Sequence, residues 1–574
     1  MTVSGLNLVS SSNNTAGTSF TTSSISPTAN SLVLLSFLVR NAVSVDPVTP
    51  TVTGAGLTWV EVNSSLYDPD SSTRRKLFVF RALGASPSTG ALTIDFGAVT
   101  HANITYAIDE FSGVDTSGTN GSGAIVQSGH NEVTDGTVST LTVTLSAFSN
   151  LGNATFGAFA ANNDSNTTTA GTGFTKLGDV LDSGRLMTEF RSDNDTTVNF
   201  TLSTTSDLGG VAVEIKPAPL TTSWTVSAQI KADNTKVSGA SDLTNFPVLI
   251  KDGNIPASVY SAMQSAGQDL RITTDSAGTT EIPFEIVSIT PASGLAEVWA
   301  KIPTLTTATD TSIYLWSGNS SAIAYAANAP FGSQAVWTDY KVVSHLEGSS
   351  FDDTSNANAG TDTAITYSSG NGKFNQGAGF NGTTSKIVLT SEQTSTTGSF
   401  SLWFKTSTAG TLQFYSQGKS SGGDTDRIQL ELAVGCVELL VVQSSAVVLN
   451  VKTNSTFNDG NFHLATYVVG ASSNTIYVDG TAQAVTYSTG TSATSKWFGT
   501  ISASTDTKDI GVLNIVGAFY NYFNGAMDDI RISNTTPTSD WIATEYANQN
   551  SPSTFWSEVV ASSVRHLSLL GCGT

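Results

Sequence analysis

Cysteine and positive charge are both scarce in this chain. Its 574 residues include 2 Cys and 25 Lys plus Arg, against 46 Asp plus Glu, which gives a formal net charge of −21. Two cysteines, Cys436 and Cys572, cannot form a disulfide framework, so each domain must be stable through its own packing. A strongly negative field repels phosphate groups, and we therefore expect neither nucleic acid nor an anionic membrane as a partner.

Long apolar runs are also absent. No run reaches the roughly 18 residues that a membrane-spanning helix needs, so membrane insertion is not expected. The first residues, Met1–Gly5, have neither the basic part nor the apolar part of a secretory signal. We expect a protein that stays inside a cell, leaves by a route that needs no N-terminal signal, or is released when a virus lyses its host.

Charged residues make up only 12% of the chain, about half the usual share. Ser, Thr, Asn and Gly take their place, and this composition favours exposed strands and tight turns over helices. Only short stretches, such as Pro256–Ala266 and Ser539–Asn548, are expected to be helical. The length predicts three to four domains, and a hydrophobic share of 39% is enough for well-packed cores.

Residues 1–217 contain many short strand-like runs separated by Gly, Asn, Asp and Ser. This pattern predicts an antiparallel β-sandwich. The segment Ser31–Val39 is almost continuously apolar, so it should be a central strand covered on both faces. The overall pattern resembles β-sandwich modules that recur in bacteriophage structural proteins. No repeat of convincing period is visible across this region and the last one.

A Pro-rich segment, Lys216–Thr222, marks the first predicted domain boundary because two prolines in three residues favour an extended spacer. Residues 223–337 follow as a β-rich domain. The order of three motifs in it, Asn245–Ile250, Ile282–Ile286 and Ala296–Pro303, resembles a domain of unassigned function found in bacterial surface proteins. That domain commonly precedes a laminin-G-like jelly roll, and it brings no known activity.

Residues 339–559 carry an ordered set of further motifs. These are His345–Leu346, Phe351–Asn356 (FDDTSN), Gly379–Gly382 (GFNG), Phe400–Lys405 (FSLWFK), Asp459–His463 (DGNFH), Ile476–Gly480 (IYVDG) and Phe523–Ile532 (FNGAMDDIRI). The set resembles the laminin-G-like, concanavalin A-like jelly roll, which usually binds sugars or proteins and only sometimes cuts sugars. The tail, residues 560–574, should be peripheral. The predicted fold class is therefore all-β, with tandem antiparallel β-sandwiches ending in a concanavalin A-like jelly roll.

Acidic residues of this last region suggest a calcium site. Asp352, Asp353 and Asn356 share one loop, and Asp528 lies at the entrance of a late strand. The resemblance implies that the first and last strands lie close together, so oxygen ligands from both could meet at one Ca²⁺. The alternative is turn formation, because these are ordinary turn and cap residues. Asp528 and Asp529 should face opposite sides of a regular strand, so at most one of them would bind.

A glycan site is the second expectation for the jelly roll. Sugar binding needs flat apolar rings beside polar groups that hold hydroxyls. The candidate ligand residues are Trp497, Tyr520, Tyr522, Asp424 and Asp426. Core packing is the alternative for the aromatic residues, and a solvated hairpin is the alternative for the acidic loop.

No catalytic constellation is visible. The glycanases of this fold place their carboxyl pair on one strand in a Glu-x-Asp-x-x-Glu type of pattern, and the chain has no such pattern. Its five histidines are scattered and show no zinc-ligand spacing, and neither a nucleophile elbow nor a phosphate-binding glycine loop is present. We expect a protein that is not an enzyme.

These features predict a non-catalytic virion structural protein of a bacteriophage, of the capsid-decoration or tail-fibre type. It would lie on the virion surface or outside the cell, form a homo-oligomer with other virion proteins around it, and bind glycans or host-surface polysaccharide through the jelly roll. Many displayed copies would convert weak sugar contacts into avidity. The alternatives are a cellular adhesin or matrix protein exported without an N-terminal signal, and a polysaccharide-degrading enzyme.

Overall fold

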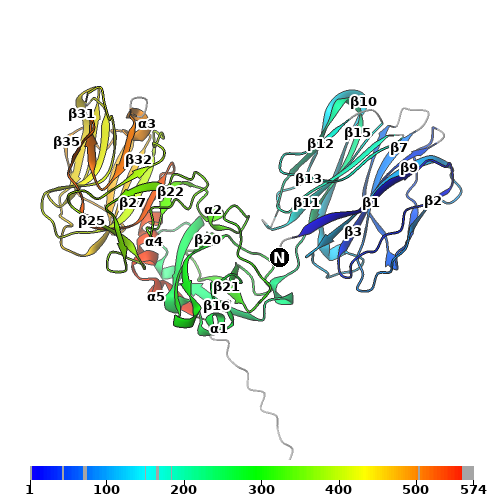
Figure 1. The fold of residues 1–574 in the computed structure, drawn as a ribbon, viewed down its shortest axis with the longest axis horizontal. Coiled ribbons are helices and arrows are strands. Elements are labelled where there is room, and N and C mark those ends of the chain that lie inside the picture. The colour runs from blue at the N-terminus through cyan, green and yellow to red at the C-terminus, as the bar shows by residue number, and fades with distance from the viewer. Residues whose placement is uncertain are drawn as a thin grey trace, which may run out of the picture. The chain divides into compact units, whose positions relative to one another are not determined.

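The computed structural model describes residues 3–41, 44–68, 74–148, 150, 152–162, 167–182, 184–423, 425–501 and 505–558. This part of the chain consists of antiparallel sheets with a few short helices (Figure 1), which confirms the all-β prediction. Internal contacts divide the chain into two units. Unit 1 is Met1–Ser223 with Ala277–Glu281, and unit 2 is Trp224–Ser276 with Ile282 onward. The tail 560–574, including Cys572, lies outside the described residues.

Unit 1 contains three sheets. The first has the order β1 (Ser4–Asn13), β9 (His101–Ser112), β3 (Leu32–Asn41), β7 (Arg75–Ala82) and β6 (Val60–Asp68). The second has the order β10 (Ile125–Thr144), β15 (Thr197–Ile215), β11 (Ala154–Ala161), β14 (Arg185–Arg191) and β13 (Thr175–Leu181), with β12 (Thr168–Ala170) paired to β15. A small sheet has the order β2 (Ser19–Thr21), β8 (Leu92–Asp95), β4 (Thr51–Gly54) and β5 (Leu57–Thr58).

One topology occurs twice in unit 1. Strands β10, β15, β11, β14 and β13 follow the same order in the second sheet as β1, β9, β3, β7 and β6 in the first. In the second copy β10 and β15 are long strands of 20 and 19 residues. The last part of β10, Thr140–Thr144, pairs with the first part of β15, and this pairing is equivalent to that of β2 with β8 in the small sheet. Similar motifs, TVTGAGLT from Thr51 and TTAGTGFT from Thr168, mark equivalent positions. Gly56 and Gly173 of these motifs have φ angles of 66° and 83°, which favour glycine.

The apolar strand β3 lies between two cores. Every residue from Leu32 to Val39 is buried, which confirms the prediction of a strand covered on both faces. Leu34 and Leu38 pack against the second sheet, while Leu35 and Phe37 pack against the small sheet. Because side chains of a strand alternate in direction, a continuous apolar run is what this position requires.

Unit 2 begins with a small two-sheet domain. Its sheets have the orders β18 (Arg271–Thr273), β21 (Thr311–Ser317), β16 (Val226–Ala232), β40 (Trp556–Glu558), and β17 (Leu243–Lys251), β20 (Leu295–Leu305), β19 (Phe284–Thr290). The helices beside them are α1 (Ala257–Ala262), α2 (Ser333–Val336), α4 (Ser539–Asn550) and α5 (Pro552–Phe555). Helices α1 and α4 confirm the two helical predictions. Because α4 packs on β17 and β40 pairs with β16, the end of the chain completes this domain.

The jelly roll lies between the two parts of that domain in the sequence. One sheet has the order β24 (Thr366–Ser368), β25 (Gly377–Asn381), β39 (Asn524–Ser533), β27 (Gly398–Lys405), β32 (Phe462–Gly470), β33 (Ser473–Val478) and β34 (Thr481–Ala482), with β22 (Tyr340–Ser344) paired to β39. The other has the order β23 (Gly360–Thr363), β26 (Lys386–Leu389), β36 (Thr507–Ile510), β28 (Thr411–Gly418), β29 (Arg427–Ala433), β30 (Cys436–Gln443), β31 (Ala446–Thr453) and β35 (Val485–Thr489). Helix α3 (Phe498–Ile501) and the hairpin of β37 (Leu513–Ile515) and β38 (Ala518–Tyr520) complete the domain. Cys436 carries a free thiol.

Within the described residues, no helix combines the length and the apolar character needed to cross a bilayer.

A buried carboxyl should make the stability of unit 1 depend on pH. Asp109 of β9 is fully buried, and burial raises its pKa to about 7, although a hydrogen bond from Asn7 (2.8 Å) opposes the shift. Between pH 4 and 7 the folded state therefore keeps a proton that the unfolded chain releases. We expect the free energy of unfolding to fall as pH rises through this window, by up to about 1.4 kcal/mol per pH unit from this group.

The variant Asp109→Asn should remove that part of the slope, since an amide does not titrate. Hydrogen exchange of the β3, β9 and β11 amides at pH 5 and pH 7.5 measures it. The matched variant Asp95→Asn, at an exposed position of β8, should leave the slope unchanged. An unaltered pH dependence in Asp109→Asn contradicts the prediction.

Candidate functional site

The small domain of unit 2 and the jelly roll share an apolar cluster. Its buried members are Leu249, Trp299, Val336, Trp337, Val343, Phe374, Trp403 and Leu464. They come from both domains and pack against the outer face of the jelly-roll sheet that contains β27, β32 and β39. This cluster surrounds a set of buried charges, so the charges lie where water is excluded.

Arg531 of β39 is the first centre of this charge set. Its guanidinium lies 4.2 Å from the ring centre of Trp299 and 4.7 Å from that of Trp337. It pairs with Asp529 at 2.7 Å and with Glu545 of α4 at 3.1 Å. Burial alone would lower the pKa of Arg531, but these two carboxylates outweigh it and raise the pKa. The guanidinium thus connects the jelly roll to the helix that completes the small domain.

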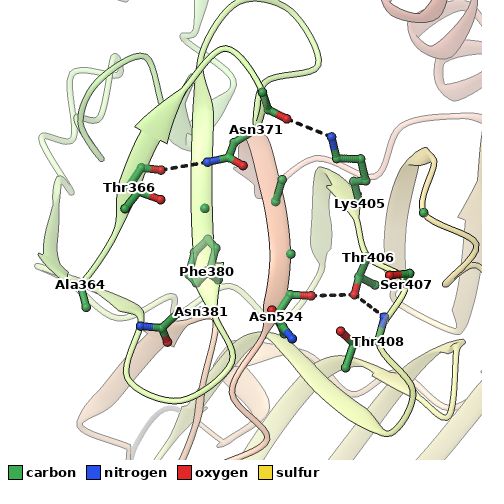
Figure 2. A pocket seen from close by; sticks show the side chains of 15 residues that line it. Ala364, Thr366, Asn371, Phe380, Asn381, Lys405, Thr406, Ser407, Thr408 and Asn524 are labelled. Carbon is green, nitrogen blue, oxygen red and sulfur yellow. Dashed lines mark hydrogen bonds between the residues drawn. The ribbon is translucent and has the colours of Figure 1, made fainter.

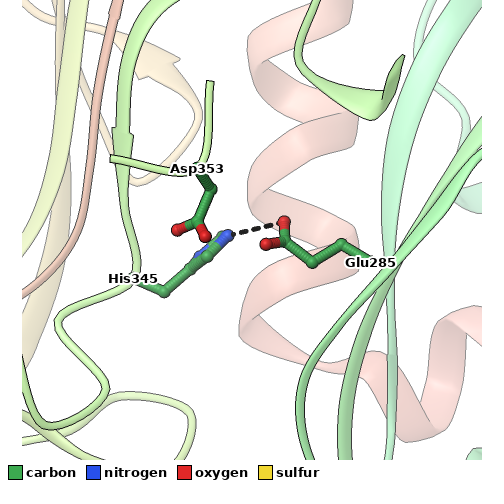
Figure 3. A group of neighbouring side chains, drawn as sticks. All are labelled: Glu285, His345 and Asp353. Carbon is green, nitrogen blue, oxygen red and sulfur yellow. Dashed lines mark hydrogen bonds and ion pairs between the residues drawn. The ribbon is translucent and has the colours of Figure 1, made fainter. Parts of the chain in front are cut away.

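His345, at the end of β22, is the second centre (Figure 3). Its Nδ1 lies 2.9 Å from Asp529, its Nε2 lies 3.3 Å from Glu285 of the small domain, and its ring stacks on Trp299. Burial opposes the charged imidazole, but the two carboxylates raise the pKa of His345 well above its usual value. The same contacts hold the pKa of Glu285 low, against the effect of burial. His345 is therefore an imidazolium that bridges both domains.

Asp353 completes a group of three that has metal-ligand chemistry. Ligand atoms of Glu285, His345 and Asp353 lie within 4.8 Å of one another, and among the described residues this is the one such group of His, Cys, Asp or Glu side chains. Burial and the charge of Glu285 raise the pKa of Asp353 to about 8. A divalent cation would have to displace the proton on His345, and an imidazole nitrogen suits zinc better than calcium.

The predicted calcium residues are mostly engaged elsewhere. Asp352 accepts hydrogen bonds from the backbone amides of Val343, Thr354 and Asn358, at 3.1, 3.0 and 2.6 Å, and so shapes its own loop. Asn356 donates to the hydroxyl of Thr354 at 3.1 Å. These contacts are the turn chemistry that was the alternative to a metal site. Of the four predicted calcium residues, Asp353 is the one that belongs to the group it forms with Glu285 and His345.

The expected opposite orientation of Asp528 and Asp529 is wrong. Asp528 accepts from the backbone amides of Lys373 and Phe374, at 2.6 and 3.2 Å, while Asp529 binds His345 and Arg531. Both carboxylates therefore serve the same outer face of the sheet. The reason is a bulge, because the register of β39 against β27 shifts here and Asp529 has a φ of 48°.

A polar groove of about 570 Å³ lies farther along this outer face (Figure 2). Its lining residues come from β24, β25, β27, β39 and nearby loops; they are Ala364, Thr366, Gly370, Asn371, Gly379, Phe380, Asn381, Lys405, Thr406, Ser407, Thr408, Gly460, Asn524, Gly525 and Ala526. Hydroxyl, amide and ammonium groups dominate, and Phe380 is buried beneath them. We call this site the polar groove.

Hydrogen bonds fix the walls of the polar groove. Lys405 donates to the carbonyl of Gly370 at 2.9 Å, and the Thr406 hydroxyl donates to the backbone carbonyl of Asn524 at 2.6 Å. In contrast, the side chains of Ser407 and Asn524 are exposed and make no hydrogen bond within the described part of the chain. Gly379 keeps the floor low, because a Cβ there would lie 2.4 Å from the Asn371 amide nitrogen.

Of the aromatic residues predicted to contact sugar, the structure exposes some and buries others. Tyr520 on β38 is 51% exposed, and its neighbour Phe519 lies 6.5 Å from the ring of Tyr522. Trp497 is fully buried in the jelly-roll core, so its proposed contact with sugar is wrong. Sequence reasoning could not separate it from exposed aromatics because burial is decided by distant strands.

Of the two acidic residues predicted in the loop before β29, the structure describes Asp426. Asp424 lies outside the described residues. Asp426 accepts from the Ser444 amide at 3.1 Å and the Thr425 hydroxyl at 2.7 Å, and lies 3.4 Å from Lys419. It is thus part of the turn structure, as the solvated-hairpin alternative supposes.

A pair of carboxyls that the sequence did not indicate lies in the other sheet. Glu431 of β29 and Glu438 of β30 are cross-strand partners, 4% and 6% exposed. Burial and the neighbouring Glu438 raise the pKa of Glu431 to about 7. Gln429 donates to Glu431 and Asn450 donates to Glu438, each at 3.0 Å. Both carboxyls are therefore enclosed and engaged within the sheet.

Sequence reasoning missed Arg531, Glu285 and Glu545, and also the groove residues Ser407 and Asn524. The sequence contained only weak indications of their roles. Asn524 and Arg531 lie inside the motif that suggested the jelly roll, where they served as markers of the fold. Asp529 of the same motif pairs with Arg531, but Glu545 on α4 and the two tryptophans that contact Arg531 lie outside the motif.

Removing the guanidinium should strongly destabilise unit 2. In Arg531→Leu, two buried carboxylates lose their cation, and breaking a buried pair in this way costs about 3–5 kcal/mol. Lys251→Met is the matched control, because Lys251 pairs with Asp252 at partly exposed positions, and exposed pairs contribute at most about 1 kcal/mol. Denaturant unfolding followed by tryptophan fluorescence compares the two. Equal losses in both variants would contradict the importance of the Arg531 pairs.

Comparison with known families and structures gives matches for unit 2. Residues 380–543 match the family model described as the concanavalin A-like lectin/glucanases superfamily, and residues 266–368 match a domain of unknown function. In the structure, β22, β23 and β24 of the second range belong to the jelly-roll sheets. No curated protein sequence matches the chain.

Several solved structures are similar to part of the chain. A leech intramolecular trans-sialidase is 14% identical with a TM-score of 0.24, over 27% of this chain and 24% of that one, so the chain spans about a quarter of its length. The CBM40 domain of the Ruminococcus gnavus IT-sialidase is 13% identical with a TM-score of 0.25, over 32% of this chain and 96% of that one. Domain 4 of a GH43 extracellular arabinanase from Geobacillus stearothermophilus, in complex with arabinotriose, is 19% identical with a TM-score of 0.29, over 36% and 98%. The C-terminal part of this chain is thus a concanavalin A-like jelly roll, as predicted, and a domain of unknown function precedes it.

Proposed function

We propose that the jelly roll binds glycans in the polar groove and that the chain acts as a binding protein without catalysis. The observation that carries this proposal is the lining of the groove. A concavity of about 570 Å³ falls within the size range of ligand sites, and its hydroxyl, amide and ammonium groups match the hydroxyls of a sugar.

The free groups of the groove suit this ligand. A sugar hydroxyl both donates and accepts, as do the exposed hydroxyl of Ser407 and the amide of Asn524. The low floor at Gly379 and Gly525 lets a ring approach the backbone closely. Aromatic stacking is not supplied by the groove, so we expect weak single-site affinity that gains strength from many displayed copies.

Absence of catalysis is part of the proposal. Retaining and inverting glycosidases need two carboxyls that flank the bond to be cut. Glu431 and Glu438 are adjacent but almost fully buried, so a polysaccharide would not reach them in this conformation. A reducing-sugar assay on algal and bacterial polysaccharides tests this point, and activity lost in Glu431→Gln would favour an enzyme instead.

The biological setting is the finer part of the proposal. We place the chain on a bacteriophage virion, as a capsid-decoration or tail-fibre protein that forms a homo-oligomer beside other virion proteins and meets host-surface polysaccharide. Its support is the resemblance of residues 1–217 to phage modules, together with a unit 1 built of two tightly packed copies of one topology. A cellular adhesin or matrix protein, exported without an N-terminal signal, would use the same groove.

Glycan binding should depend on the groove and not on the aromatic hairpin. On a glycan array, Ser407→Ala with Asn524→Ala should weaken binding at least tenfold, since two free hydrogen-bonding groups are lost. Tyr520→Ala is the matched control on the same domain and should bind as the unchanged protein does. The reverse pattern would move the site to the β37–β38 hairpin, and no binding to any glycan would refute the proposed function.

Virion location and calcium are tested separately. Mass spectrometry of purified particles should find the chain under the virion proposal and should lack it if the protein is a cellular adhesin. Calcium remains a proposal for Asp353 and its neighbours, and EDTA should then reduce glycan binding, with recovery on added Ca²⁺. Binding that survives EDTA removes calcium from the proposal and leaves the groove in place.

A further inference from the structure

A second cavity, of about 410 Å³, lies where the small domain of unit 2 meets the jelly roll. It shares no lining residue with the polar groove. Its wall has four sources: the start of β17 in the small domain, the segment from α2 to β22, strands β27, β32 and β39 of the jelly roll, and α4 with the segment that leads into it. Figure 1 shows α4 between these two domains. We call this site the junction cavity.

Buried polar groups in the wall of the junction cavity lack partners. Thr466 of β32 is 2% exposed, and its hydroxyl makes no hydrogen bond with any described residue. Arg531 is 1% exposed, and its Nε also makes no hydrogen bond with any described residue. Nearly all buried polar atoms in proteins are paired, and an unpaired one is costly. A polar guest in the cavity would remove that cost.

The charged side chains of the cavity leave no positive charge to attract an anion, because the carboxylates of Asp242, Asp339 and Glu545 line the wall together with Arg531. The Arg531 guanidinium is held by Asp529 and Glu545, at 2.7 and 3.1 Å, so it has no net charge to offer an anion. The lining side chains without a hydrogen bond among the described residues include the hydroxyls of Thr466 and of Ser399 and Ser401 on β27, together with those of Thr244 and Thr536 and the amide of Asn245. The wall therefore favours a neutral ligand that can form many hydrogen bonds.

Apolar surface completes the chemistry. Trp541, Val336 and Pro537 also line the cavity. A flat apolar face combined with hydroxyl partners is the arrangement that a sugar ring requires, because the ring has C–H faces and an equatorial set of hydroxyls.

We propose that the junction cavity is a second ligand site, which takes a neutral sugar of one or two rings and is complete only when the two domains are docked. This goes beyond glycan binding in the groove, because it gives the domain of unknown function a share in recognition. Leu243 and Thr244 of β17 supply one wall, and the jelly roll alone would leave the site open.

The test uses the full chain and a panel of D-glucose, D-galactose, D-mannose, L-arabinose and neutral disaccharides of these. Titrations are followed by tryptophan fluorescence, since Trp541 lines the cavity, and by hydrogen exchange. At least one sugar should bind saturably and should protect residues 242–245 together with residues 535–541. Thr466→Val, which removes the hydroxyl at equal volume, should weaken binding at least tenfold, and Ser401→Leu should abolish it by filling the space.

Thr475→Val on the neighbouring strand β33 does not line the cavity and should bind as the unchanged protein does; melting temperatures show that each variant is folded. The proposal is overturned if no sugar of the panel binds, if Thr466→Val binds normally, or if protection is confined to groove segments; the cavity then holds water only.

Ser407→Ala with Asn524→Ala separates the two sites, because it should reduce binding of long glycans in the groove and leave small sugars in the junction cavity. If the unchanged protein binds small sugars but no long glycan, the proposed glycan site in the polar groove is refuted and the junction-cavity proposal stands.

Discussion

Two buried cations, Arg531 and His345, hold together the part of the molecule that contains the two proposed ligand sites. Both belong to the jelly roll, while their carboxylate partners include Glu285 of the small domain and Glu545 of α4. Charges in a dry interface require partners at defined positions, because an unpaired one is strongly unfavourable. We interpret these pairs as the contacts that fix how the two domains dock, with the surrounding tryptophans supplying the apolar burial.

Docking divides the outer face of one jelly-roll sheet into two environments. Where the small domain and α4 cover it, the face carries Trp403, Leu464 and the charge network. Beyond that cover it is lined by glycines, hydroxyls and amides, and it forms the polar groove. The junction cavity lies within the docked region itself. One face of a single sheet thus carries both the docking contacts and the proposed glycan groove.

Unit 1 is built on a different principle. Two copies of one topology share a core between their central sheets and have a second core on each far side. Among its described residues there is no group of three metal-capable side chains, and its buried acids, such as Asp109 and Glu189, serve packing positions between sheets.

The sequence by itself determined the fold class, the doubly covered strand at Leu32–Val39, the two helices and the jelly roll, because alternation, turn residues and motif order are local properties. Only the tertiary structure revealed the repeat in unit 1, since fused strands in the second copy remove any constant spacing. Likewise, the burial of Trp497, the shared orientation of Asp528 and Asp529 at a bulge, and the contacts of Arg531 with Trp299 and Trp337 depend on segments distant in the chain. Sites made from distant segments carry no local signal, so their residues become recognisable only after the sheets have closed on one another.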